Sequence, residues 1–167
     1  MARAVLTAAM LLGCATALAQ APAPAPSLYT ERSINAALAQ DAVNAAVEAC
    51  AGRGHRVTAV VVDRSGIMKA MLRADGAGPH GVWAARAKAY TAASTRIGTT
   101  QLLEAVRANP GATRLPDVEG FLILGGGLPI RVGDEVVGGI GVDGAPGGLL
   151  DDQCAEAGIA RIRDRLG

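Results

Sequence analysis

The chain has 167 residues, half of them apolar and only four of them aromatic, with 16 Lys and Arg against 15 Asp and Glu. No basic stripe is visible, so the composition argues against nucleic-acid binding, which needs clustered cations facing the phosphates. This length predicts one compact domain plus an export segment. Its core would be rich in Ala and Gly and bury little area per residue, which favours a homo-oligomer.

Residues 1–19 have the features of a secretory signal peptide. Arg3 precedes a mostly apolar run over residues 4–12, and the Ala-Leu-Ala of residues 17–19 matches the small-x-small cleavage pattern. The run is too short to span a membrane. The alternative is a lipoprotein signal in which Cys14 carries the lipid. We therefore expect a periplasmic or secreted protein, with no membrane insertion after cleavage.

An Ala/Pro-rich tether is expected over residues 20–27, because each Pro blocks a helix and lacks a backbone donor. The folded domain should then cover residues 28–167. Its first helix is predicted over residues 31–51, with Thr30 as the N-cap and Gly52 at the end.

Two strands joined by a tight turn are predicted next, over residues 57–62 and 67–73. The first is a β-branched run typical of a buried strand. The charged residues Asp63, Arg73 and Asp75 are expected to gather on one side of this pair. Charges at strand ends beside a helix start are a common way to build a small-molecule site.

The remaining elements follow in order from the apolar periodicity and the turn residues. They are helices over residues 80–96 and 99–108, strands over 121–124, 129–132 and 135–142, and a last helix capped by Asp151 or Asp152 that runs to about residue 166. The order α-β-β-α-α-β-β-β-α predicts an α+β fold, with helices packed against a five-stranded, mostly antiparallel sheet.

Two cysteines, Cys50 and Cys154, remain after signal cleavage. Export favours a disulfide between them, because antiparallel packing of the first and last helices would bring them together. The alternative is two separate buried thiols. The absence of a Cys-x-x-Cys pair leaves a zinc site or a redox motif without support.

Six segments, in matching order, resemble the GlcG/HbpS family of haem-binding proteins. The same segments also resemble the C-terminal domain of PduO-type cobalamin adenosyltransferases. They are Val-Val-Val-Asp-x-x-Gly at 60–66, Arg-x-Asp-Gly-Ala at 73–77, Ala-Lys-Ala-x-Thr-Ala at 87–92, Gly-Gly-Gly-Leu-Pro-Ile at 125–130, Gly-x-Ile-Gly-Val at 138–142 and the acidic start of the last helix. The resemblance implies a profilin-like sandwich, homo-oligomers, and haem or another small-molecule ligand.

Under this resemblance His80 is the expected axial ligand of the haem iron, because it follows a Gly-rich loop beside the charged residues. The alternative is a capping or solvated loop histidine, and His55 is the less favoured ligand. Trp83, one turn further along the helix, offers an apolar surface to the ligand. Tyr90 could supply a phenolate ligand, or it could pack on the helix.

Arg73 and Lys88 could hold the haem propionates or another carboxylate-bearing ligand. Alternatively, Asp63 and Asp75 could neutralise these cations inside the protein. No complete catalytic motif is present. The expected function is an exported protein that sequesters or carries haem. An enzyme or accessory protein acting on a small organic acid, or a partner of a membrane sensor, are the alternatives.

Overall fold

The computed structural model describes residues 28–167. The expected signal peptide and tether therefore lie outside the described residues. The chain divides into two units, Met1–Thr30 and Glu31–Gly167, and the second contains the helices and strands of the described part. Among the residues described, no helix has both the length and the apolar character that a membrane crossing needs.

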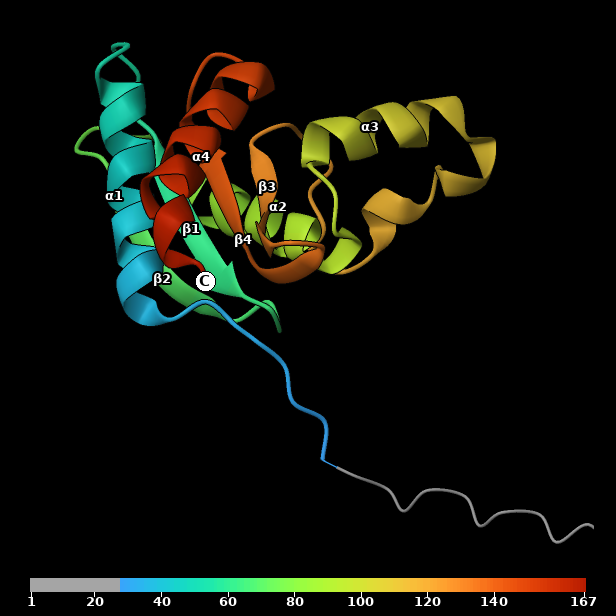
Figure 1. The fold of residues 1–167 in the computed structure, drawn as a ribbon. Helices are drawn as coiled ribbons and strands as arrows, with labels where there is room; N and C mark the ends of the chain where they lie inside the picture. The colour runs from blue at the N-terminus through green and yellow to red at the C-terminus, as the bar shows by residue number, and fades with distance from the viewer. Residues whose placement is uncertain (1–27) are drawn as a thin grey trace, which may run out of the picture. The chain divides into compact units, whose positions relative to one another are not determined.

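The centre of the second unit is a four-stranded antiparallel sheet (Figure 1). In chain order its strands are β1 (Thr58–Asp63), β2 (Met68–Arg73), β3 (Gly127–Val132) and β4 (Glu135–Asp143). In space the order is β2-β1-β4-β3. The two middle strands are buried along almost their whole length, which explains the continuous apolar run of β1.

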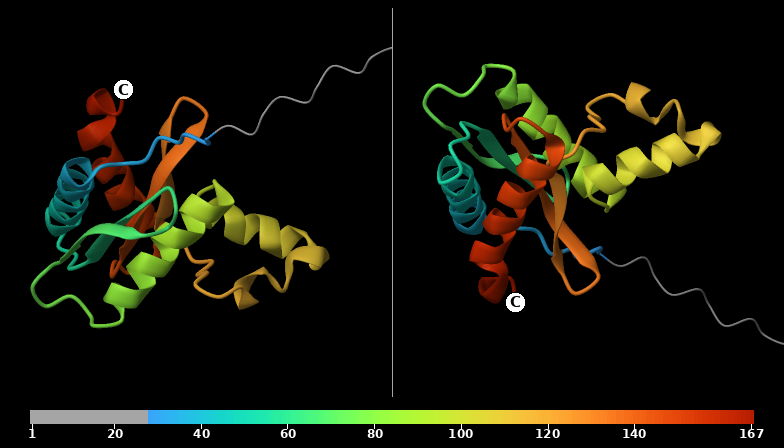
Figure 2. Two further views of the ribbon diagram at one scale, coloured as in Figure 1. Left: turned by 90° about the horizontal axis from the view of Figure 1, so that it is seen from below. Right: turned by 90° about the horizontal axis from the view of Figure 1, so that it is seen from above.

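Helices cover both faces of this sheet, so the unit is a three-layer sandwich (Figure 2). On one face lie α1 (Ala36–Ala51) and α4 (Gly148–Ile162), which pack on each other and on the sheet. On the other face lies α2 (Gly81–Thr95). Successive β1 side chains alternate between the layers: Val61 points to α1 and α4, and Val60 points to α2.

Glycines in β4 let α2 sit unusually close to the sheet. A Cβ at Gly141 would overlap the carbonyl oxygen of Ala85, and one at Gly139 would overlap that of Ala89. The helix has small side chains on the face that packs against the sheet, at Ala85, Ala89 and Ala93. The core is therefore close-packed backbone against backbone, which fits a chain with so few aromatic residues.

The segment between α2 and β3 projects from the sandwich (Figure 2). It contains α3 (Thr99–Ala108) and two short 3-10 helices, η1 (Pro110–Ala112) and η2 (Leu115–Asp117). Few of its side chains are buried. After η2 the chain returns to α2 before entering β3.

The predicted α+β class and antiparallel sheet are confirmed, but the prediction of five strands is wrong. Residues 121–124 form no strand. Their backbone bonds the neighbouring helix instead: the Leu122 amide donates to Thr91 Oγ1 of α2 at 2.9 Å. The first helix also starts later than predicted, because Ile34 donates to the Val137 carbonyl of β4 and Asn35 supplies the cap.

The predicted grouping of Asp63 with Arg73 and Asp75 is also wrong. Arg73 pairs with Thr58, at the far end of the hairpin from Asp63. Asp63 lies at the turn, where its Oδ1 accepts the backbone N–H groups of Ser65 and Ile67 at 3.0 and 2.9 Å. The two strands are antiparallel, so the end of one lies beside the start of the other.

The predicted disulfide between Cys50 and Cys154 is present, with a Cα–Cα distance of 5.6 Å. It joins the last turn of α1 to the first half of α4. Gly147, rather than Asp151 or Asp152, occupies the N-cap of α4, and Asp151 lies in the first turn.

Candidate functional site: two cavities along helix α2

Side chains of α2 that do not face the sheet form two rows. His80, at the N-cap, is followed at four-residue spacings by Ala84 and Lys88, which places the three on one side of the helix. Trp83 and Tyr90, seven residues apart, belong to a neighbouring row. The first row borders one cavity and the second row another, with Trp83 bordering both, and together these cavities form the candidate site.

A buried ionic cluster lies at the end of the first row. Lys88 is completely buried, and its Nζ lies 2.7 Å from Asp143 Oδ1 and 3.0 Å from Asp151 Oδ2. The ammonium also donates to the Val142 carbonyl at 3.0 Å. His80 Nε2 lies 3.5 Å from Asp143 Oδ2, so the imidazole sits over the cluster.

The cluster holds two carboxylates and one ammonium, so it carries one net negative charge while both carboxylates are ionised and the imidazole is neutral. Burial raises the pKa of Asp151, and the nearby Lys88 ammonium opposes that shift. Asp151 Oδ1 additionally accepts the Ala145 amide at 3.0 Å. Lys88 is thus neutralised within the protein and is not available to an incoming anion.

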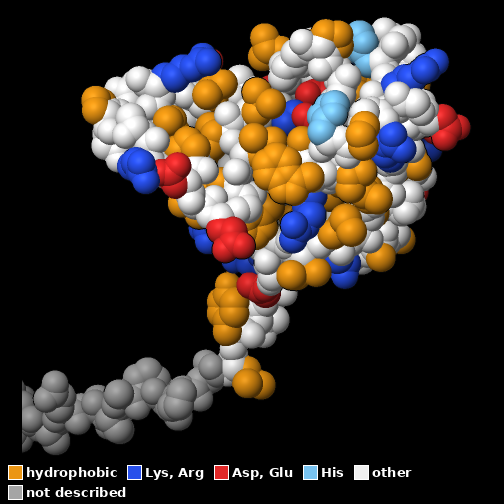
Figure 3. Space-filling model, turned by 180° about the vertical axis from the view of Figure 1, so that it is seen from behind, with side chains coloured by type: hydrophobic (Ala, Val, Ile, Leu, Met, Phe, Trp, Pro, Cys, Tyr) orange, Lys and Arg blue, Asp and Glu red, His pale blue; other side chains and the backbone are white. Residues whose placement is uncertain are grey.

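The first cavity opens above this cluster and has a volume of about 510 Å³. Its apolar wall is formed by Trp83, Leu122 and Leu124, and its polar end by His80 with the cluster. In Figure 3 a hollow shows acidic and basic atoms next to a histidine, with hydrophobic side chains gathered beside it. Trp83 is 58% exposed and Leu124 45% exposed, so this wall is open to a ligand.

Residues 118–124 contribute to the lining of both cavities, through Leu122 and Leu124 in the first and Val118, Glu119 and Gly120 in the second, and we call them the wall loop. The Phe121 ring packs edge-to-face on Tyr90, with centroids 6.0 Å apart. Gly120 also lies against the Tyr90 ring, where a Cβ would come within 3.2 Å of it. These contacts and the bond from Leu122 to Thr91 hold the loop on α2.

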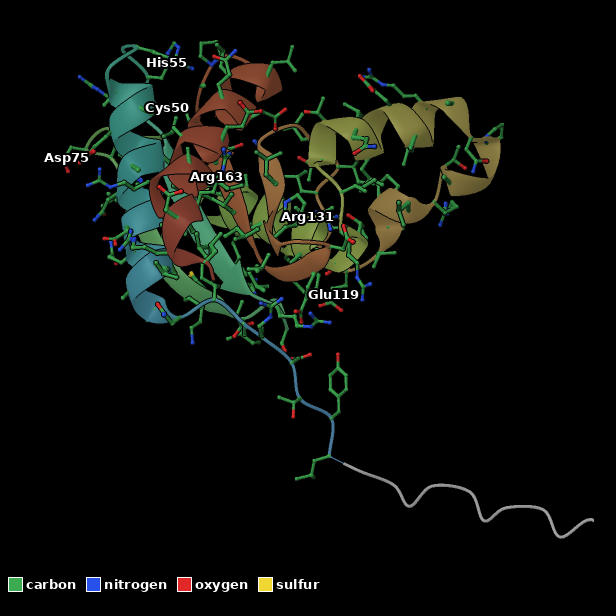
Figure 4. The ribbon with its side chains drawn as sticks, in the orientation of Figure 1. Cys50, His55, Asp75, Glu119, Arg131 and Arg163 are labelled. Atoms are coloured by element: carbon green, nitrogen blue, oxygen red, sulfur yellow. A yellow bond between two sulfur atoms is a disulfide. The ribbon has the colours of Figure 1, made fainter. Side chains whose placement is uncertain are left out.

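The second cavity adjoins the first at Trp83 and has a volume of about 400 Å³. Tyr90 and Trp83 line it from α2, together with the exposed Arg86. Val118 and Glu119 line it from the wall loop; Figure 4 labels Glu119. Trp83 borders both cavities, which places them side by side along the helix.

The structure brings together three of the six residues expected at the site. His80, Trp83 and Lys88 line the first cavity, and Tyr90 lines the second. Arg73 and Asp75 line neither. Arg73 instead donates to the Ala77 carbonyl, and Asp75 is an exposed residue that Figure 4 shows beside α1, well away from Glu119.

Sequence reasoning missed Asp143, Leu122 and Leu124, and treated Asp151 as a possible helix cap and part of an acidic family segment rather than as a site residue. A signal for Asp143 existed, because it is a carboxylate directly after a buried apolar strand. The eight-residue spacing of His80 and Lys88 was a second signal, since it places both on one side of a helix.

Residues 34–160 match the protein-family model described as "Haem degrading protein HbpS-like". The match covers most of the chain and all the elements that build the two cavities, so the protein belongs to the HbpS-like family. The resemblance seen in the sequence motifs is thereby confirmed.

Solved structures agree with this assignment. A double mutant of HbpS from Streptomyces reticuli is 40% identical, with a TM-score of 0.77 over 89% of this chain and 99% of that one. The protein ORFY from Klebsiella pneumoniae is 25% identical, with a TM-score of 0.77 over 84% of this chain and 98% of that one.

One curated protein is similar to part of this chain. It is an uncharacterized 15.0 kDa protein of Citrobacter freundii from the dhaT-dhaS intergenic region, 38% identical over 88 residues. The match covers 50% of this chain and 61% of that relative.

Proposed function

We propose that this protein binds haem in the first cavity and serves as an exported, homo-oligomeric haem carrier or sequestering protein. The observation that carries the proposal is the placement of His80 at the polar end of an apolar-walled cavity, in a chain of the HbpS-like family. Iron porphyrins need both elements: an apolar surface for the ring and a nitrogen ligand for the metal.

The residues present suit such a ligand. Trp83 and the two leucines of the wall loop offer a surface on which a planar ring could lie. The His80 side chain is 73% exposed, and its contact with Asp143 is long, so the imidazole is free to turn toward a metal. Bound haem would supply redox and oxygen chemistry, and the protein would position it and limit its contact with water.

The cavity also constrains ligand orientation. The floor has two carboxyl groups, Asp143 and Asp151, against the single ammonium of Lys88, so it favours neutral or cationic groups over carboxylates. An organic acid held by Arg73 and Lys88 finds less support for this reason, because Lys88 is neutralised and Arg73 lies outside the cavities.

Oligomerisation is supported by apolar side chains left exposed at the edge strand β2 and the turn before it. Ile67, Met68 and Met71 are exposed by 63, 47 and 40%. Exposed apolar side chains next to each other favour a protein contact. Export rests on the signal features of the sequence, and the intact mass of the exported form checks it: a start at Gln20 supports simple cleavage, and a lipidated start at Cys14 contradicts it.

Titration of the purified mature protein with haemin tests the proposal. A Soret band characteristic of ligated haem should appear, and His80→Ala should shift that band and weaken binding, because the iron loses its nitrogen ligand. The change should leave the fold intact, since His80 is exposed and makes no cap bond. His55→Ala is the matched control, because Figure 4 places His55 at the end of α1, away from both cavities.

A wild-type spectrum and affinity in His80→Ala would assign the axial ligand to another residue. A complete lack of haemin binding by the wild-type protein would remove the proposed function itself.

A further inference from the structure

We infer that Arg86 is the residue that receives the ligand's carboxylates, so that the haem spans both cavities with its iron toward His80 and its propionates toward Arg86. This inference rests on the proposed function and specifies the orientation of the ligand in that same site. It also gives the second cavity a role, as the anion-binding end of the site.

An anion in this site needs a cationic partner among the side chains that line the cavities. The basic residues lining the two cavities are His80, Lys88 and Arg86. Lys88 is buried and already bonded to two carboxylates, and His80 lies against one of them. A propionate directed at this end would meet two carboxyl groups that already occupy the single ammonium. The anion-binding end must therefore be elsewhere in the site.

Arg86 satisfies the chemical requirement. It is exposed, and it takes part in none of the ion pairs or side-chain hydrogen bonds found within residues 28–167. Its guanidinium can offer two parallel N–H donors to one carboxylate. No side chain has to be displaced for it to bind an anion.

The position of Arg86 along the helix also fits. It follows Trp83 by three residues and precedes Tyr90 by four, so all three side chains share one side of α2. Arg86 comes six residues after His80, which is a rise of about 9 Å along the helix axis. That length is comparable with the reach from the centre of a porphyrin to its propionate carboxylates. Trp83, shared by both cavities, lies between the two ends.

Glu119 limits how strongly the second cavity attracts anions. It lines the same cavity as Arg86, and the ion pairs found within residues 28–167 do not include one between the two. A carboxylate bound by Arg86 would be close to this negative side chain. Glu119 therefore opposes binding, and Glu119→Gln should strengthen it while leaving the guanidinium in place.

The test compares haemin with haemin dimethyl ester, in which both carboxylates are blocked. Affinities come from Soret titrations of the wild-type protein and of Arg86→Gln. Wild type should lose affinity about five- to tenfold on esterification, because a charge-assisted hydrogen bond at a partly solvated site is worth that much. Arg86→Gln should lose about the same factor for haemin, and esterification should weaken it no further. Glu119→Gln should bind haemin more tightly than wild type and the ester unchanged.

Arg107→Gln is the matched control, because Arg107 is an exposed arginine in the last turn of α3 and lines neither cavity. It should bind both compounds as wild type does. Equal losses on esterification in wild type and Arg86→Gln, or no loss in wild type, would overturn the inference. Those outcomes still leave haemin bound, whereas failure of the proposed function would appear as no Soret change in any variant.

Discussion

The buried position of Asp151 disfavours the ionised form of its carboxyl group. The side chain is almost fully buried, and burial raises its pKa above the ordinary value of 3.8 even though Lys88 lies beside it. Between that value and the raised pKa, the folded protein binds more protons here than the unfolded chain. The contribution of Asp151 to stability must therefore fall as the pH rises through this interval.

Replacing Asp151 by Asn should show that the contribution of Asp151 to stability falls as the pH rises. The free energy of unfolding of wild type, relative to Asp151→Asn, should decrease as the pH rises from about 3.8 to the raised pKa and then level off. Urea denaturation of both proteins at a series of pH values measures the difference.

Glu135 provides a control of opposite sign. The hydrogen bond from Arg32 lowers the pKa of Glu135, so its contribution is present above the ordinary value of 4.5 and is lost as the pH falls through the lowered pKa. If the free energy of unfolding of wild type relative to Asp151→Asn also rose with pH, the raised pKa of Asp151 would be contradicted.

The ionic cluster shows which residue roles the sequence could not reveal. Helical spacing could have placed Lys88 in one row with His80, but its carboxylate partners come from the end of β4 and the start of α4. Such partners are distant in the chain, and only the packing of three elements brings them together. From the sequence, Asp63 and Asp75 were considered as carboxylate partners of Lys88, because they are nearer to it in the chain.

At the level of elements, the contact between α2 and β4 depends on the absence of side chains. Gly141→Ala should destabilise the protein by about 1–3 kcal/mol, because the new methyl would overlap the Ala85 carbonyl and push the helix from the sheet. Gly147→Ala should have a much smaller effect, since nothing lies near its Cβ position and its backbone is extended. Urea midpoints of the two variants measure the difference, and equal midpoints would show that α2 can shift without cost.

Elements bounded by local signals were predictable from the sequence. Helix α3 has the predicted bounds, because Asn109 and Pro110 end it locally. Residues 121–124 were wrongly predicted as a strand, because a short apolar run is equally consistent with a loop packed on a helix. The hydrogen bond from Leu122 to Thr91 that decides between them joins distant parts of the chain.

On the scale of the whole molecule, the disulfide links the first helix to the last over 104 residues. Replacing both Cys50 and Cys154 by Ala should lower the free energy of unfolding by roughly 2–5 kcal/mol, because the unfolded chain regains the freedom that the crosslink removes. Thermal or urea unfolding measures the loss. Thiol titration of the denatured, unreduced mature protein should find no free thiol, and two titratable thiols would contradict the crosslink.

The overall arrangement was accessible from the sequence in outline. The family motifs identified the class, and the export signals together with two cysteines suggested the disulfide. The number of strands and the two cavities were not accessible, because both depend on how the segment between α2 and β3 folds back onto the helix.

The close seating of α2 on the β4 glycines has a consequence for the speed of ligand exchange. A helix pressed backbone to backbone against a sheet is a fixed wall, whereas the wall loop is joined to α2 by the hydrogen bond from Leu122 to Thr91 and by its packing on the Tyr90 ring. We expect a ligand to enter and leave when this loop opens. The rate of ligand dissociation should then be limited by the rate at which the contact between Phe121 and Tyr90 breaks. Amide hydrogen exchange with and without haemin would show this as protection gained at residues 118–124 while α2 stays unchanged.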